Sequence, residues 1–234
     1  MPNWKEKKPH WFEKYAWFFT SDNYLFVLGK TADQNEEIVS KHLEKNDLYF
    51  HSAVAGSGSG VLKISSQKMP SPTSLEECGA FLIAHSKAWN SGVPDKAYWV
   101  NPNQVSKTPE TGEYVTKGSF IIRGKKNYLS MPKMIMGMTI LYKFNDDVGF
   151  GYHQIDSEYT IDKITNAIPM IAPYSRLDNF DIKVKIITGK IKAGKALKNN
   201  IIPKFSKNDL MRSVIKKIPL DVFSRIMISN VRIS

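Results

Sequence analysis

Short runs of aromatic and β-branched residues recur along the first 142 residues and are separated by polar turns. The runs at 15–20 and 24–28 flank Ser21-Asp22-Asn23, and this combination predicts a β-hairpin because the three polar residues favour a tight turn. The same pattern predicts further strands at 48–51, 61–64, 97–100, 119–123 and 139–142.

Two segments between these runs have helical spacing. Thr31, with Gln34 three residues later, predicts a capped helix, and Thr73 with Glu76 predicts a second one that ends near Asn90. These elements predict an α+β fold with a mixed or antiparallel sheet and two main helices, followed by a small basic α+β domain.

The clearest interruption of the pattern is Asn145-Asp146-Asp147 with the glycines that follow it. We expect a domain boundary there, which gives one domain over 1–146 and a second over 147–234.

In the second domain, residues 167–174 are apolar but contain two prolines, and residues 182–186 alternate between apolar and charged, as in a half-buried strand with a basic outer face. Ser206 predicts the N-cap of a helix that continues to 217. Pro219 predicts the start of a last short helix, and 229–233 a final strand.

Charge is concentrated in that second domain. The chain of 234 residues has 33 Lys and Arg against 22 Asp and Glu, and a formal net charge of +11. Most of the excess lies in the short C-terminal part, where Asp209 is the single acidic residue between Lys183 and Lys217. Such an excess favours a polyanionic partner and says nothing of the fold.

The residue types give little support for catalysis. A single cysteine, Cys78, excludes an internal disulfide framework and any zinc site that needs two thiolates, and it fits a reducing compartment. Five scattered histidines form no metal-binding pair, and no transmembrane run or signal-peptide core is expected. Gly56–Gly60 resembles a phosphate loop only in its glycines, because a strand rather than a helix follows, so a mobile turn is predicted. His51, at the end of a strand, is interpreted as a buried or semi-buried histidine.

Two basic segments indicate nucleic-acid binding. The segment 117–128 combines cations, glycines and aromatic residues without an acid; the alternative is a strand whose lysines are merely solvated. In the segment 183–198, a helix after Gly189 would place lysines every three residues on one broad face, and a bound polyanion would relieve their repulsion. The candidate RNA-binding residues are Lys107, Lys117, Arg123, Lys125, Lys126, Tyr128, Lys183, Lys185, Lys190, Lys192, Lys195 and Lys198.

Several of these residues belong to longer motifs that resemble a known family. Thr111-Gly112-Glu113-Tyr114, the stretch Gly118–Asn127 and shorter matches between 9 and 144 resemble the NFACT-R domain of the nuclear export mediator factor family, which acts in ribosome quality control. The motifs Ala167-Ile168-Pro169 and Gly194-Lys195-Ala196 resemble the NFACT-C domain of the same proteins.

The resemblance also has departures. Ala16, Ala53, Ala55 and Asn103 stand where the family usually shows His, Asp, His and His. The resemblance implies a chain that lacks the family's N-terminal domain and coiled coil.

The leading hypothesis is a non-enzymatic, cytoplasmic, ribosome-bound protein that needs no cofactor and no metal. It would bind rRNA, on the large subunit by expectation, and tRNA as a second RNA partner. Its role would be that of a dormancy (hibernation) factor or of a reduced quality-control factor. The alternative is a free-standing RNA- or DNA-binding module that acts off the ribosome. The residue types give little support for the hypothesis of an enzyme that acts on RNA. No membrane and no obligate small-molecule partner is expected.

Overall fold

The structure is a computed structural model that describes residues 4, 8–54, 56–65, 68–109, 114–144, 151–154, 163–206 and 209–234. It divides into two compact units, which are described separately: the N-terminal unit (14–134) and the C-terminal unit (1–13 with 135–234). The strand pairs of the described residues are all antiparallel, and both units combine sheets with helices, so the predicted α+β fold class is confirmed.

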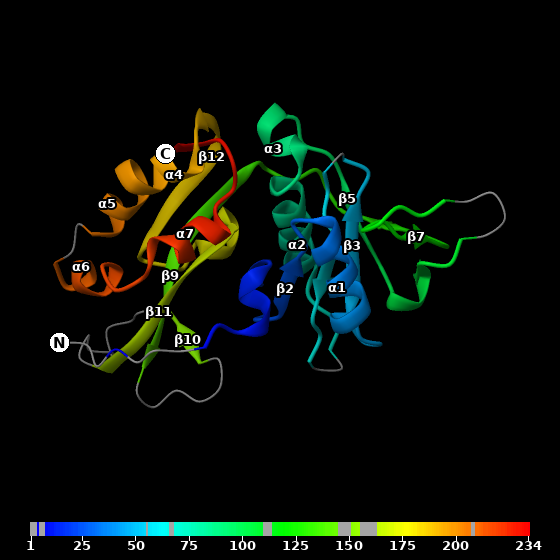
Figure 1. The fold of residues 1–234 in the computed structure, drawn as a ribbon, viewed down its shortest axis with the longest axis horizontal. Coiled ribbons are helices and arrows are strands. Elements are labelled where there is room, and N and C mark those ends of the chain that lie inside the picture. The colour runs from blue at the N-terminus through cyan, green and yellow to red at the C-terminus, as the bar shows by residue number, and fades with distance from the viewer. Residues whose placement is uncertain are drawn as a thin grey trace. The chain divides into compact units, whose positions relative to one another are not determined.

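The N-terminal unit is built on a six-stranded antiparallel sheet (Figure 1). Its strand order is β1 (Ala16–Phe19), β2 (Leu25–Leu28), β4 (Gly60–Leu62), β3 (Leu48–Ser52), β5 (Ala97–Val100) and β8 (Asn127–Tyr128). A separate pair joins β6 (Val105–Ser106) to β7 (Ile121–Ile122). β1 and β2 form the predicted hairpin, in which Asn23 adopts a positive φ of 61° at the turn.

The helices of this unit are α1 (Ala32–His42), α2 (Pro72–Ala84) and α3 (Lys87–Ser91), with a 3₁₀ turn at Pro102–Gln104. A further 3₁₀ turn, Trp11–Lys14, spans the point where the chain passes from the C-terminal unit into this one. α1 and α2 cover opposite faces of the sheet, because neighbouring residues of a strand point to opposite sides. Tyr49 of β3 packs with Val39 of α1. Phe50, the next residue, contacts Phe26, whose ring lies 5.9 Å from that of Phe81 in α2.

The helix starts partly match the sequence prediction. Thr31 caps α1 and accepts a hydrogen bond from the Gln34 amide at 3.2 Å, as predicted. The N-cap of α2, however, lies two residues before the predicted cap at Thr73: it is Ser71, because the proline after it suits the first helical position. The predicted second helix is also two helices, since Ser86 starts α3 with a cap of its own.

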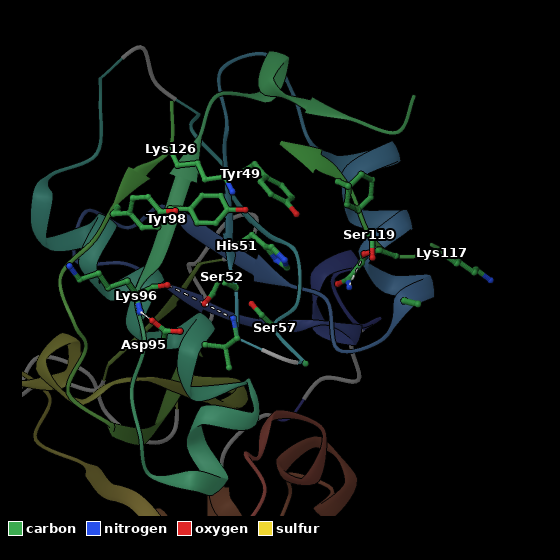
Figure 2. A pocket seen from close by; sticks show the side chains of 18 residues that line it. Tyr49, His51, Ser52, Ser57, Asp95, Lys96, Tyr98, Lys117, Ser119 and Lys126 are labelled. Carbon is green, nitrogen blue, oxygen red and sulfur yellow. Dashed lines mark hydrogen bonds between the residues drawn. The ribbon is translucent and has the colours of Figure 1, made fainter. Parts of the chain in front are cut away.

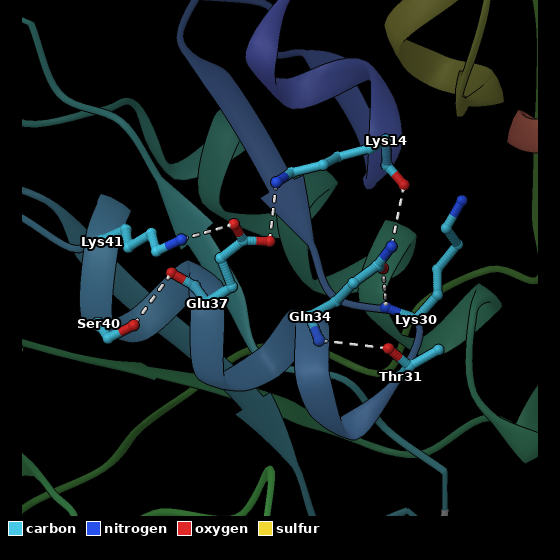
Figure 3. Close-up of polar contacts among 7 residues, drawn as sticks. All are labelled: Lys14, Lys30, Thr31, Gln34, Glu37, Ser40 and Lys41. Atoms are coloured by element: carbon cyan, nitrogen blue, oxygen red, sulfur yellow. Dashed lines mark hydrogen bonds and ion pairs between the residues drawn. The ribbon is translucent and has the colours of Figure 1, made fainter.

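Polar side chains of α1 bind the segment that leads into β1 (Figure 3). Glu37 accepts from Lys14 Nζ at 2.8 Å and from Lys41 Nζ at 3.1 Å. Gln34 donates to the Lys14 carbonyl at 3.1 Å and accepts from the Lys30 amide at 2.9 Å. The first turn and the middle of α1 are therefore bound to the neighbouring chain through Gln34 and Glu37. These bonds also fix the position of Asn35 and Glu36, which lie between them in the helix.

A buried carboxylate holds the hairpin turn against α2. Glu77, 3% exposed, accepts from the Ser21 amide at 2.8 Å and from the Ser21 hydroxyl. Asp22 accepts from the Ser71 amide at 2.7 Å, and its own amide donates to the Ser74 hydroxyl. The polar turn that the sequence predicts is thus part of the cap of α2.

Asn35 of α1 connects two loops that come from distant parts of the sequence. Its Oδ1 accepts from the Ser59 amide at 3.0 Å, and its Nδ2 donates to the Gly118 carbonyl at 3.4 Å. Glu36 accepts from the Gly118 amide at 2.7 Å. Gly29 leaves room for this arrangement, because a Cβ there would lie 2.1 Å from Asn35 Oδ1. The loops 56–60 and 116–120 are therefore both fixed by one helix.

The C-terminal unit has a sheet centred on β9 (Ile135–Phe144). β11 (Ile164–Pro173) pairs with one edge of β9, while β12 (Lys183–Ile191) and β10 (Tyr152–His153) pair with the other; β13 (Val231–Ile233) extends the sheet beyond β12. Both prolines of 167–174 lie in β11, which pairs with β9 alone among the described strands; a strand at a sheet edge tolerates proline because one row of its N–H groups has no partner strand.

The helices of this unit follow β12. A 3₁₀ turn at Tyr174–Leu177 precedes β12, and α4 (Ala193–Ala196), a π turn (Leu197–Ile201) and α5 (Ile202–Phe205) run on from one another. α6 (Asp209–Ile215) and α7 (Leu220–Ile226) come next. The start of α7 after Pro219 is confirmed. Ser206 is not the N-cap that the sequence predicts: it ends α5, where its hydroxyl donates to the Ile202 carbonyl at 2.9 Å.

The compact units are not delimited where the predicted domains are. Residues 1–13 and the strand β9, both placed in the first predicted domain, belong to the C-terminal unit, in which β9 pairs with β11 and β12. The predicted boundary at Asn145-Asp146-Asp147 lies outside the described residues. The domain limits 1–146 and 147–234 stay a prediction.

Gly118→Ala is expected to destabilise the N-terminal unit more than Gly124→Ala. Both glycines have a positive φ, 80° and 76°, so each alanine costs about 1–2 kcal/mol in backbone strain. A Cβ at Gly118 would in addition lie 2.6 Å from Ala32 Cα, whereas at Gly124 the nearest atom, Gln104 Nε2 at the end of a side chain, is 3.1 Å away. Urea unfolding curves of the two variants measure the difference, and equal losses would contradict the docking of Gly118 on α1.

Candidate nucleic-acid interface

Three rings lie in register across neighbouring strands of the N-terminal sheet. His51 of β3 pairs with Tyr98 of β5, and Tyr98 pairs with Tyr128 of β8. The ring centroids are 6.2 Å apart for the first pair and 5.6 Å for the second, both edge to face. Tyr49 is two residues before His51 and so shares its face, the side covered by α1. The sheet therefore presents a row of rings that ends at Tyr128, which is 63% exposed.

This row forms part of the lining of a cavity of roughly 580 Å³ (Figure 2). The loops held by Asn35 contribute other parts of the lining, with Ser57 on one side and Lys117 and Ser119 on the other. Phe120 also lines the cavity. Ala53, one of the departures from the family pattern, also lines the cavity. Asp95 is the single carboxylate among the described lining residues.

Cations lie over two of the rings. Lys126 Nζ is 4.7 Å from the centre of the Tyr98 ring, and Lys107 Nζ is 5.3 Å from that of Phe120. Phe120 in turn lies 6.2 Å from Tyr49. Burial raises the pKa of Tyr98 to about 12, so its phenol stays neutral and the ring faces the ammonium as an uncharged π system.

Two polar groups inside the cavity keep hydrogen-bonding capacity. His51 Nδ1 is 2.9 Å from the Gly58 carbonyl, which can only accept, so Nδ1 carries the proton. Burial lowers the pKa of His51, so the ring is neutral at pH 7 and Nε2 is an acceptor. The Ser57 hydroxyl is buried and has no hydrogen-bond partner among the described residues.

Carboxylates of α1 hold two of the predicted RNA-binding lysines. Lys107 pairs with Glu36 and Lys117 with Asp33. The hydrogen bond from Lys107, together with that from the Gly118 amide, lowers the pKa of Glu36, and the hydrogen bond to Asp33 raises the pKa of Lys117. Each of these two ammonium groups therefore faces a carboxylate of its own molecule.

The remaining basic residues of this loop are positioned through their backbone. Gln104 Nε2 donates to the carbonyls of Arg123, at 2.8 Å, and Lys125, at 3.0 Å. Lys125 is exposed, and Arg123 is partly buried. Lys126 and Tyr128 line the cavity. The RNA-binding residues predicted in this unit therefore lie around one cavity and in the loop beside it. Lys107 does not line the cavity itself but contacts the ring of Phe120, which does.

The C-terminal set divides into two groups. Lys183 donates to the carbonyls of Leu177 and Asp178, both at 2.7 Å, and its ammonium lies 5.5 Å from the Tyr174 ring, as does that of Lys185. These two lysines have partners within the unit. The exposed group is Lys190, Lys192, Lys195 and Lys198.

The helix expected after Gly189 begins later. β12 continues to Ile191 because its last residues pair with β13, and α4 starts at Ala193. Lys192 is therefore the N-cap residue rather than part of a helical face, and Lys198 lies in the π turn. Gly189 itself lies against β13, where a Cβ would be 2.5 Å from the Arg232 amide.

Sequence reasoning missed His51, Tyr98 and Phe120 as parts of a site. The signal for the first two was present, because both lie in predicted strands, but their proximity depends on the pairing of β3 with β5. Within the described part of the chain, no group of three or more His, Cys, Asp and Glu could hold a metal ion. Among the same residues, no helix has the length and apolarity to cross a membrane.

Comparisons with known proteins agree with the motifs. The sequence profile of the NFACT protein RNA-binding domain matches residues 14–124, and that of the NFACT protein C-terminal domain matches 155–234. The chain is 43% identical over 142 residues to the human ribosome quality control complex subunit NEMF, covering 61% of this chain and 13% of that protein. It is 42% identical over 142 residues to the Drosophila melanogaster ribosome quality control complex subunit NEMF homolog, and the match covers 61% of this chain and 14% of that protein.

An archaeal relative, the Rqc2 homolog aRqcH of Methanocaldococcus jannaschii, is 37% identical over 145 residues, which cover 62% of this chain and 21% of that protein. The matched region is thus a small part of each of these relatives. Among solved structures, the C-terminal part of the fibronectin/fibrinogen-binding protein from Streptococcus suis aligns with a TM-score of 0.43 and 22% identity, over 54% of this chain and 48% of that one. With both of its domain profiles matched in order, the chain belongs to the NFACT family and contains an NFACT RNA-binding domain.

Proposed function

We propose that this protein binds ribosomal RNA on the ribosome, in the cytoplasm, without catalysing a reaction. The observation that carries the proposal is the cavity of the RNA-binding domain, where rings and lysines face the same space. The relatives named above are ribosome quality control proteins, which supports the ribosome as the partner. We favour the large subunit as the binding site and tRNA as a further RNA partner.

Lysines supply the affinity in this proposal. Lys125 in the N-terminal unit and Lys190, Lys192, Lys195 and Lys198 in the C-terminal unit are exposed, and no acidic residue lies between 182 and 208. Neutralising phosphates with such side chains releases counterions, so binding weakens steeply with salt. Phosphate contacts carry no sequence information, so the position on the ribosome would follow from RNA shape and from contacts with ribosomal proteins.

Two cellular roles are compatible with ribosome binding. A dormancy factor would occupy idle ribosomes, and a quality-control factor would bind large subunits that still carry a stalled chain. We favour dormancy or a reduced quality-control role over a module that binds free RNA or DNA, because the named relatives are ribosome quality control subunits.

The charge-reversal variants Lys125→Glu/Lys126→Glu and Lys192→Glu/Lys195→Glu are expected to weaken ribosome binding. Each lysine that contacts a phosphate contributes about one unit to the slope of log K against log salt, so each double variant should lower that slope by up to about two. The control Lys45→Glu/Lys133→Glu changes the same charge at exposed sites outside the predicted RNA-binding set. Sedimentation with ribosomes at several salt concentrations measures this, and equal effects of control and test variants would contradict the assignment.

Gradient profiles of cells that express the tagged protein separate the roles. Dormancy predicts the protein on vacant monosomes, and quality control predicts it on split large subunits with peptidyl-tRNA. Binding of purified protein to naked RNA as tightly as to ribosomes at matched salt would favour the free-standing module instead.

A further inference from the structure

We propose that the cavity of the N-terminal unit binds one unpaired nucleobase, which stacks beside Tyr98 and Tyr128 while its phosphates lie toward the lysines of the rim. This inference rests on the proposed RNA binding and adds to it the form of RNA that the site selects: a nucleotide turned out of its strand rather than a helical segment.

The first argument is the exposed end of the ring row. Tyr128 lies on the two-residue strand β8, at the edge of the six-stranded sheet, and keeps 63% of its surface exposed although it lines the cavity. Its neighbour Tyr98 is only 5% exposed and holds it edge to face. A base that stacks on Tyr128 would cover this apolar ring, and every base has a π face suited to it.

The second argument is the polar interior. A site for a phosphate alone needs only cations and N–H groups, whereas this cavity also contains the Nε2 acceptor of neutral His51 and the Ser57 hydroxyl, which has no hydrogen-bond partner in the part of the chain that the structure describes. An acceptor repels phosphate oxygens, but it matches the N–H donors on the edge of a base. A buried hydroxyl without a partner is costly, and a bound base edge would satisfy it.

The third argument is the distribution of charge around the opening. Lys96, Lys117 and Lys126 line the cavity, and Asp95 is the single carboxylate among its described lining residues. Lys126 already lies over the Tyr98 ring, at 4.7 Å, where it can reach the phosphate of a nucleotide whose base is stacked beside that ring. A volume of roughly 580 Å³ lies within the range of small-ligand cavities, about 300–1,000 Å³. Bases paired within a duplex stay stacked and cannot enter, so single-stranded or bulged RNA is the form that fits.

The test compares two RNAs of equal charge. A labelled single-stranded 12-mer and the same sugar-phosphate strand without bases are titrated with the full chain, and binding is followed by fluorescence anisotropy. We expect the strand with bases to bind about tenfold more tightly, the size that stacking of one base on an aromatic ring gives. Tyr128→Ala should abolish this preference and Tyr128→Phe should keep it.

Two controls isolate the cavity. Tyr114→Ala removes another exposed tyrosine, 88% exposed, that does not line the cavity, and it should leave the preference intact. Inorganic polyphosphate should bind all variants equally, because it has no base. Equal affinity of the wild-type chain for the two RNAs, or an unchanged preference in Tyr128→Ala, would overturn the base pocket.

Failure of the broader proposal has a different readout. If the wild-type chain does not sediment with ribosomes, ribosome binding is wrong whatever the RNA titrations give. If it sediments with ribosomes but binds both RNAs equally, the ribosome proposal stands and the base pocket falls.

Discussion

The geometry of the RNA-binding domain depends on one amide side chain. Asn35 accepts from one loop and donates to another, and its partners Ser59 and Gly118 are 24 and 83 residues away in the sequence. A side chain with a donor and an acceptor on one planar group is needed for both bonds, which neither Asp nor Leu would provide. Since the two loops flank the cavity, the width of the cavity is set from α1, and the sheet only supplies its floor.

The sheet that forms the floor of the cavity is apolar and well packed, but part of its apolar surface stays exposed. A row of rings across β3, β5 and β8 buries apolar surface and stabilises the sheet, yet it ends at a tyrosine that remains mostly exposed. The lysines beside it are attracted to the ring faces and to the carboxylates of α1. Lys107 and Lys117 are exposed but pair with Glu36 and Asp33, so any anion that approached them would compete with these carboxylates.

Local sequence signals predicted what depends on neighbouring residues. The hairpin, the cap of α1 by Thr31 and the start of α7 needed only short-range patterns. The cavity did not follow from them, because it requires β8, a strand of two residues, to pair with β5, and a helix amide to bind a glycine 83 residues away. The assignment of β9 to the first region has the same cause: an apolar strand does not reveal its partner. The basic segments were visible as composition, while the partners of Lys183 and Lys117 were not.

The prolines of β11 have a consequence for the behaviour of the protein at high concentration. A strand that pairs on one side only can template a strand from another molecule, which is a route to aggregation. Pro169 and Pro173 have no N–H group to offer, and their spacing of four places both on the same edge, the one turned away from β9. The long apolar β11 therefore offers two fewer N–H groups to a strand of another molecule, which disfavours growth of the C-terminal sheet at this edge.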